Sequence, residues 1–160
     1  MRMNRGLAWA SLLLLCAALA ACSSGPVRRV SPPAASIQQL TVNADGSWSV
    51  DLRLQNYSSI PMRFTSATLA ITVSDQPAGT LQGAPQISIG PESADVVTLP
   101  FKPTVEARIV VADALAGRRP LAYALKGTLD AVPEEGKSRT FDIKSNNTLN
   151  PVPGLDGVLR

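Results

Sequence analysis

Residues 45–55 read DGSWSVDLRLQ, and this stretch decides the fold class. Asp45-Gly46 is a dipeptide typical of the tight turn in a β-hairpin. Beyond it, apolar and polar side chains alternate over residues 48–55, with the apolar set Trp48, Val50, Leu52 and Leu54. Because successive side chains of a strand point to opposite faces, this period of two predicts a half-buried strand. Residues 37–42 before the turn supply its hairpin partner.

The alternation continues through the rest of the chain. It predicts a long strand over 62–74, short ones over 79–81, 85–89 and 94–99, and two more around 121–131 and 141–143. One segment departs from it, since residues 104–116 place apolar side chains three and four apart: Val105, Ile109, Ala112 and Ala116. Together with Thr104 at the start and Gly117 at the end, this spacing predicts a short helix, although Ile109-Val110-Val111 would also suit a strand. Six to eight short strands over residues 36–149 with one short helix predict an all-β fold, a β-sandwich of antiparallel strands in two sheets.

A family resemblance rests on the order of these segments. The strand centred on Trp48, an Asn-containing turn, the long strand 62–73, the Gly-x-Leu step at 79–81 and the Ile-Gly-Pro-Glu-Ser run at 89–93 resemble the type 2 late-embryogenesis-abundant proteins. These proteins share the WHy domain, named for water stress and hypersensitive response. The resemblance covers roughly residues 37–143, and residues 151–155 are similar to the tails of bacterial members. It implies a sandwich of about seven strands, similar to fibronectin type III, with one helix. The family's usual Asn-Pro-Asn turn is replaced here by Asn56-Tyr57-Ser58.

An export signal precedes the predicted domain. Residues 7–21 carry no charge and are almost entirely Leu, Ala, Trp and Cys, and Arg2 and Arg5 come before them. A basic start followed by a short apolar run is typical of a signal peptide, here with a signal helix. A membrane-spanning helix is the weaker alternative, because it needs roughly 20 apolar residues. The other alternative is a secreted protein whose signal is cut by an ordinary protease after the small-x-small sequence at 18–20.

The end of this run, Leu19-Ala20-Ala21-Cys22, resembles the lipobox of bacterial lipoproteins. The resemblance implies that residues 1–21 are removed and that acyl chains, palmitate among them, are attached at Cys22. A multiply acylated cysteine is a stable membrane anchor, so membrane lipid is the partner expected through Cys22. Lipidation would also explain why a single thiol remains once the signal is lost. Ser23, by resemblance to lipoproteins of enteric-type bacteria, implies the outer membrane, with the domain facing the periplasm.

Two segments flank the predicted domain. Residues 22–35, the acylated cysteine followed by a run rich in Ser, Pro and Ala, predict a flexible tether, and residues 150–160 a C-terminal tail. Arg28-Arg29 in the tether could touch anionic lipid or simply be solvated. Without the signal, 13 basic residues face 12 acidic ones, so no basic surface for a nucleic-acid partner is expected.

Catalytic chemistry finds little support in the sequence. The chain has no histidine, which excludes Ser-His-Asp and Cys-His nucleophile systems and the common histidine metal sites. Three carboxylate pairs remain, which we expect to be solvated surface charge: Glu134 with Glu135, Asp130 with Asp142, and Glu92 with Asp95. We therefore expect no enzyme, no catalytic residue, no cofactor and no metal site. Trp48 is expected to fill the core, with a ligand platform as the alternative.

Two functions of different classes follow. The resemblance implies a protein that protects the envelope in water stress, such as desiccation or hyperosmotic shock. The alternative is a tethered interaction module in envelope assembly or maintenance, which would dock on a protein partner through a sheet edge or the tail 150–160.

Overall fold

Nine strands and one helix follow one another in the described part of the chain. The structure is a computed structural model that describes residue 25 and residues 28–160. The predicted signal helix and the lipobox residues Leu19, Ala20, Ala21 and Cys22 lie outside these residues. The elements are β1 (Ala34–Val42), β2 (Trp48–Gln55), β3 (Met62–Val73), β4 (Gln76–Gly83), β5 (Ile87–Ile89), β6 (Ala94–Phe101), α2 (Val105–Ala116), β7 (Leu121–Pro133), β8 (Arg139–Leu149) and β9 (Val158–Leu159).

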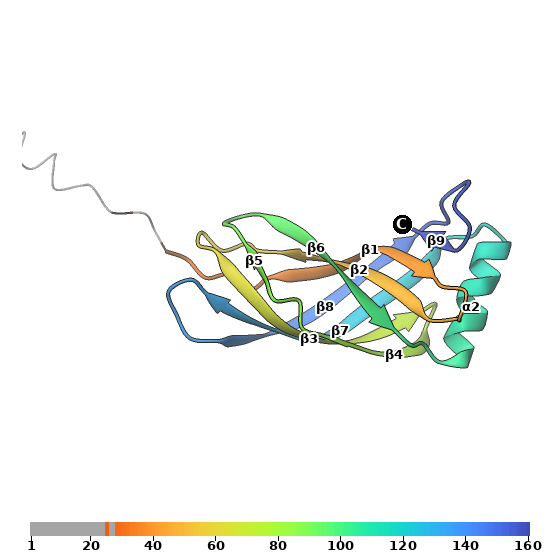
Figure 1. Cartoon of the computed structure of the whole chain (residues 1–160), viewed down its shortest axis with the longest axis horizontal. Helices are drawn as coiled ribbons and strands as arrows, with labels where there is room; N and C mark the ends of the chain where they lie inside the picture. The colour runs from red at the N-terminus through yellow and green to blue at the C-terminus, as the bar shows by residue number, and fades with distance from the viewer. Residues whose placement is uncertain (1–24, 26–27) are drawn as a thin grey trace, which may run out of the picture.

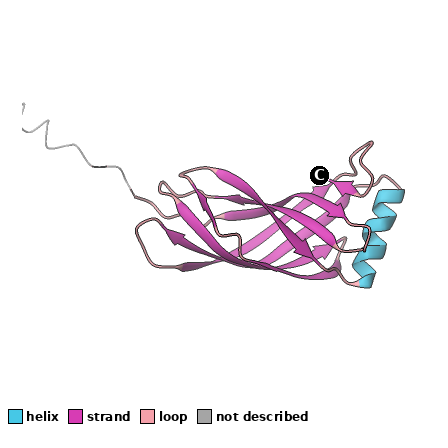
Figure 2. Ribbon diagram, viewed as in Figure 1, coloured by secondary structure: helices cyan, strands magenta, loops and turns pink. Residues whose placement is uncertain are grey.

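Two antiparallel sheets pack face to face, which confirms the predicted sandwich (Figure 1). One sheet has the order β6-β2-β1-β9, and the other has the order β4-β3-β7-β8 with β5 paired to β3. The helix α2 closes one end of the sandwich, and the N-terminal segment leaves from the opposite end (Figure 2). Among the described residues, no helix is long and apolar enough to cross a membrane.

The quoted stretch forms a hairpin as predicted. The turn between β1 and β2 is closed by the Asn43 amide, which donates to the Ser47 carbonyl at 2.8 Å, and Gly46 takes a left-handed φ of 80° there. The side chains of Trp48, Val50 and Leu52 are fully buried between the sheets. Trp48 packs against Phe101 with ring centroids 5.6 Å apart, so its expected role in the core is confirmed.

The predicted helix forms over the expected residues, but its buried face is not the expected one. The Thr104 hydroxyl caps it by accepting a hydrogen bond from the Ala107 amide at 3.3 Å. The side chains that face the sandwich are Ala107, Val111 and Ala114. The stripe that suggested the helix, Val105, Ile109, Ala112 and Ala116, faces solvent instead. Small residues fit the buried side because α2 lies close against β4 and β3.

The C-terminal segment 150–160, which the sequence predicted as a tail, adds a short strand to the first sheet. β9 pairs with β1, placing Leu159 opposite Leu40, and the Leu159 side chain is fully buried. Asn150 and Arg160 exchange backbone hydrogen bonds, so the segment folds back on itself. β9 therefore covers part of the edge of β1 that would otherwise be open.

The predicted tether is also shorter than residues 22–35. Ala34 and Ala35 already belong to β1, and Ala35 is buried. Residues 28–31 are held by hydrogen bonds to the domain. The Pro- and Ala-rich composition predicted a flexible segment. Hydrogen bonds to Ser58 and Ser59, about 30 residues away in the sequence, hold it against the domain.

Candidate functional site

The N-terminal segment is fastened to the domain by a group of residues that we call the N-terminal clamp: Arg28, Arg29, Ser31, Asn56 and Ser58. The Ser31 amide donates to the Ser58 hydroxyl at 3.0 Å, and that hydroxyl lies 3.3 Å from the Ser31 carbonyl. Ser59 extends the contact, because its amide donates to the Arg29 carbonyl at 3.0 Å and the Arg29 amide donates back to its hydroxyl at 2.8 Å. The segment is thus held to the β2–β3 connection mainly through the hydroxyl groups of Ser58 and Ser59.

Asn56 organises the clamp from inside. Its side chain is fully buried, and its amide nitrogen lies within hydrogen-bond distance of three carbonyl oxygens: Ile60 at 2.9 Å, Ile89 at 3.1 Å and Gly90 at 2.9 Å. Its side-chain oxygen accepts from the Ser58 amide at 2.8 Å. A buried amide with both ends satisfied fixes the two loops that it joins. Asn56 therefore shapes the turn that presents Ser58 to the N-terminal segment.

Two ion pairs add to the clamp at the surface. Arg28 pairs with Glu135 in the β7–β8 turn, and Arg29 lies 3.6 Å from Glu92. From the sequence we considered only anionic lipid or water as partners of Arg28-Arg29. The structure shows these two carboxylates instead. All four side chains are more than half exposed, so solvent screens both pairs and the pairs contribute little stability.

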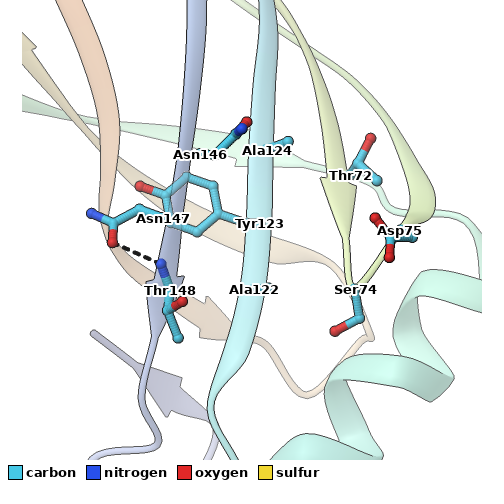
Figure 3. A pocket seen from close by; sticks show the side chains of 9 residues that line it. All are labelled: Thr72, Ser74, Asp75, Ala122, Tyr123, Ala124, Asn146, Asn147 and Thr148. Carbon is cyan, nitrogen blue, oxygen red and sulfur yellow. Dashed lines mark hydrogen bonds between the residues drawn. The ribbon is translucent and has the colours of Figure 1, made fainter.

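A polar depression of about 410 Å³ lies on the outer face of the second sheet (Figure 3). The small side chains of Ala122 and Ala124 on β7 form its low centre. Polar groups rise on both sides: Thr72, Ser74 and Asp75 from β3 and the turn after it, and Asn146 to Thr148 from β8. This surface can hold water or another hydrogen-bonding group.

Tyr123 borders the depression, but its hydroxyl group makes its hydrogen bonds elsewhere. Its hydroxyl accepts from the Ile37 amide at 2.9 Å and lies 3.3 Å from the Ile37 carbonyl, which ties the second sheet to β1. Burial raises the pKa of Tyr123, so the phenol stays protonated at physiological pH. Tyr123 is buried between the sheets, whereas Tyr57 is about half exposed.

Of the six carboxylates named from the sequence, Asp130, Glu92, Glu135 and Asp95 make surface contacts. Asp130 accepts hydrogen bonds from the Ser66 hydroxyl at 2.5 Å and the Thr140 hydroxyl at 2.6 Å, and these bonds hold the pKa of Asp130 below its usual value. A general acid needs the opposite shift. Glu92 and Glu135 serve the clamp, and Asp95 accepts from the neighbouring Val96 amide. Within the described residues, no group of three or more Cys, Asp or Glu side chains could hold a metal ion.

Sequence reasoning missed the clamp. The Asn-x-Ser sequence at 56–58 stood out as a turn, and nothing local shows that an Asn side chain will be buried there. The one available signal was the family's Asn at the start of this turn. Its partners at 89–90 lie more than 30 residues away, so only the folded chain brings them together.

Solved structures of low sequence identity resemble this chain. A solution structure of an Arabidopsis thaliana protein superposes with a TM-score of 0.51 at 12% identity, covering 82% of this chain and 85% of that one. The solution structure of a late embryogenesis abundant (LEA) protein gives 0.49 at 14% identity, over 94% of this chain and 87% of that one. The ApaA protein of Bordetella pertussis gives 0.47 at 15% identity, over 81% and 100%. At these identities the likeness concerns the fold alone.

Sequence comparison identifies the family. A comparison with curated protein sequences finds no match. The family model described as late embryogenesis abundant protein matches residues 51–147, which runs from within β2 into β8 and leaves out β1 and β9. Because the match covers more than half of the chain, the protein belongs to the type 2 late embryogenesis abundant family, a generally non-enzymatic group related to water stress.

Proposed function

We propose that the protein is a non-enzymatic lipoprotein of the bacterial envelope, held on the outer membrane by acyl chains on Cys22 and facing the periplasm. Its WHy-type domain would protect the envelope in water stress by binding through its surface. Family membership supports the protective role, and the sequence Leu19-Ala20-Ala21-Cys22 supports the anchor.

The N-terminal clamp is the observation that carries this proposal. Only residues 23–27 lie between Cys22 and Arg28, and the six steps from Cys22 to Arg28 span at most about 22 Å when extended. An acyl anchor at Cys22 would therefore keep the clamp end of the domain within about 22 Å of the bilayer. A domain held this close to the membrane has a high local concentration at the surfaces that drying forces together.

Survival after drying tests the protective role. We expect deletion of the gene to lower survival after desiccation or hyperosmotic shock, and the wild-type gene to restore it. Cys22→Ala should not restore survival, because the protein would lose its anchor. Unchanged survival of the deletion strain would contradict the protective role.

Metabolic labelling with a palmitate analogue tests the anchor separately. The wild type should be labelled and Cys22→Ala should not. Cys16→Ala is the matched control, because it removes the cysteine that is lost with the signal, and it should be labelled like the wild type. Equal labelling of the Cys22→Ala protein would contradict the lipoprotein assignment.

The second candidate, an interaction module in envelope assembly or maintenance, is favoured by apolar side chains exposed at the helix end of the domain, Val105 and Ile109 among them. A stable partner recovered by crosslinking, together with unchanged survival of the deletion strain, would favour this function over stress protection.

A further inference from the structure

The segment that leads into β1 is attached to the domain at only a few points. We call residues 28–32 the strap. They belong to no helix or strand, and Val30 is only partly buried against the core. The next residue, Pro33, is buried, so the strap ends there. The strap therefore lies on the domain without being part of its core.

Three hydrogen bonds hold the backbone of the strap. The Arg29 amide donates to the Ser59 hydroxyl at 2.8 Å, the Ser59 amide donates to the Arg29 carbonyl at 3.0 Å, and the Ser31 amide donates to the Ser58 hydroxyl at 3.0 Å. Each such bond stabilises the attached strap by about as much as the ordering of one backbone residue costs. The free energy of detaching the strap is therefore small. A contribution too weak to affect unfolding of the whole domain can decide whether the strap is attached.

The two ion pairs of the N-terminal clamp supply such a contribution. Arg28 pairs with Glu135 in the β7–β8 turn, and Arg29 pairs with Glu92 between β5 and β6, so the strap is joined to two separate loops. The four side chains are between 57% and 69% exposed, which leaves both pairs open to dissolved ions. The distance over which salt leaves charges unscreened falls from about 30 Å at 0.01 M to about 3 Å at 1 M. Attachment of the strap should therefore weaken as the ionic strength rises.

Detachment of the strap would leave its binding surface folded. The Asn56 side chain holds the β2–β3 connection from inside, through bonds to residues 58, 60, 89 and 90 and none to the strap. The Ser58 hydroxyl also has a second contact, since it lies 3.0 Å from the sulfur of Met62. On the other side, pairing of Ala34 with Gln55 fixes the chain where β1 begins. The strap can therefore leave while the sandwich stays intact.

A detached strap would be a stiff, extended arm. Ser31 is followed by Pro32 and Pro33, and a residue before proline is restricted to extended backbone. Such proline-rich chain acts as a semi-rigid spacer. The eleven steps from Cys22 to Pro33 span at most about 40 Å, compared with about 22 Å for the six steps to Arg28. Detachment would therefore nearly double the distance that separates the folded domain from Cys22.

We propose that the strap is a salt-released device that sets how far the domain extends from its anchor. At low ionic strength both ion pairs form and the strap is closed, which keeps the domain near the membrane. Loss of water concentrates the salts around the protein, and screening of the two pairs then opens the strap. The change in reach rests on the proposed function, because it needs the anchor at Cys22. Opening of the strap does not depend on it.

Hydrogen exchange followed by mass spectrometry measures the opening. The full chain would be expressed with its own leader and purified in a non-ionic detergent. The amides of residues 29–31 exchange when the strap is off, whereas those of residues 48–55 in β2 need the sandwich to open. Between 0.01 M and 1 M sodium chloride, we expect exchange in residues 29–31 to become about threefold faster or more, and exchange in residues 48–55 to stay the same.

A double substitution removes both ion pairs while preserving side-chain shape. Glu92→Gln with Glu135→Gln should give rapid exchange of residues 29–31 already at low salt, and salt should then change it little. Glu134→Gln with Asp75→Asn is the matched control, because it removes the same charge from two residues that form no ion pair within the described chain. Asparagine also tolerates the left-handed φ of 65° at position 75. This control should respond to salt as the wild type does.

Sorbitol at the osmolality of the 1 M salt separates screening of charge from loss of water. Excluded osmolytes favour burial, so sorbitol should not open the strap. The proposal would be overturned by equal exchange of residues 29–31 at both salt concentrations in the wild type, by a full salt response in the double variant, by a control that behaves like the double variant, or by opening in sorbitol. None of these measurements depends on acylation or survival, so the proposed function can fail while the strap opens as proposed, and the reverse.

Discussion

Asn56→Ala should be among the most destabilising substitutions in the domain, although the residue is polar and lies in a loop. The change would leave the Ser58 amide without its acceptor and the Ile89 carbonyl without its donor, both in buried surroundings. An unsatisfied buried group costs about 1–3 kcal/mol. The Ile60 and Gly90 carbonyls are only partly buried, so water can replace the lost donor there. We therefore expect a loss of about 2–4 kcal/mol, a large share of a typical domain stability of roughly 5–15 kcal/mol.

Urea unfolding of the mature chain, carrying Cys22→Ser, measures this loss. Trp48 reports it, because Trp9 is removed with the predicted signal and leaves one tryptophan. Gln55→Ala is the matched control: this neighbouring amide also donates to a backbone carbonyl, that of Ser93 at 3.1 Å, but in an exposed position, and its removal should cost less than about 1 kcal/mol. If Asn56→Ala cost no more than Gln55→Ala, burial of the Asn56 amide would not be what fixes the clamp.

Three further changes test the core and the surface of the sandwich. Trp48→Ala should cost about 3–5 kcal/mol in urea unfolding followed by circular dichroism, since it removes the fluorescent reporter. Trp48→Phe should cost distinctly less, because the buried indole N–H has no hydrogen-bond partner among the described residues; equal costs would contradict this. Gly127→Ala should prevent folding or greatly reduce the midpoint of thermal unfolding, because its Cβ would lie 2.0 Å from the Thr68 carbonyl oxygen, while Gly90→Ala, with its nearest neighbour at 3.8 Å, should leave the midpoint within a few degrees. Because the pKa of Asp130 is lowered in the fold, ionised Asp130 stabilises the protein above the unfolded value of about 3.8, and this stability is lost as the pH falls through the lower folded value. Asp130→Asn should therefore lose less stability in acid than the wild type. Parallel curves of unfolding free energy against pH for the two proteins would refute this.

The sequence by itself determined the strands and the helix. Alternation over residues 48–55 and the Asp45-Gly46 turn depend on neighbours in sequence, and β2 and its hairpin form where they were predicted. The same holds for α2, whose start at Thr104 and end before Gly117 are set by a local cap and a local stop. These signals act over a few residues, so they can be recognised without the fold.

Only the tertiary structure decided how these elements use their side chains. The apolar stripe through Val105 and Ile109 correctly predicted a helix, yet the helix buries its opposite, smaller face, because close contact with β4 favours Ala107 and Ala114 there. The Asn56 side chain can be buried because the fold brings the carbonyl groups of residues 89–90 within hydrogen-bond distance of it. Likewise, the composition of residues 22–35 predicts a flexible tether, but hydrogen bonds to the distant β2–β3 connection hold residues 29–31 in place, and pairing with β1 holds Val158 and Leu159. Such partners are far away in sequence, and hydrophobic periodicity carries no information about which distant groups will meet.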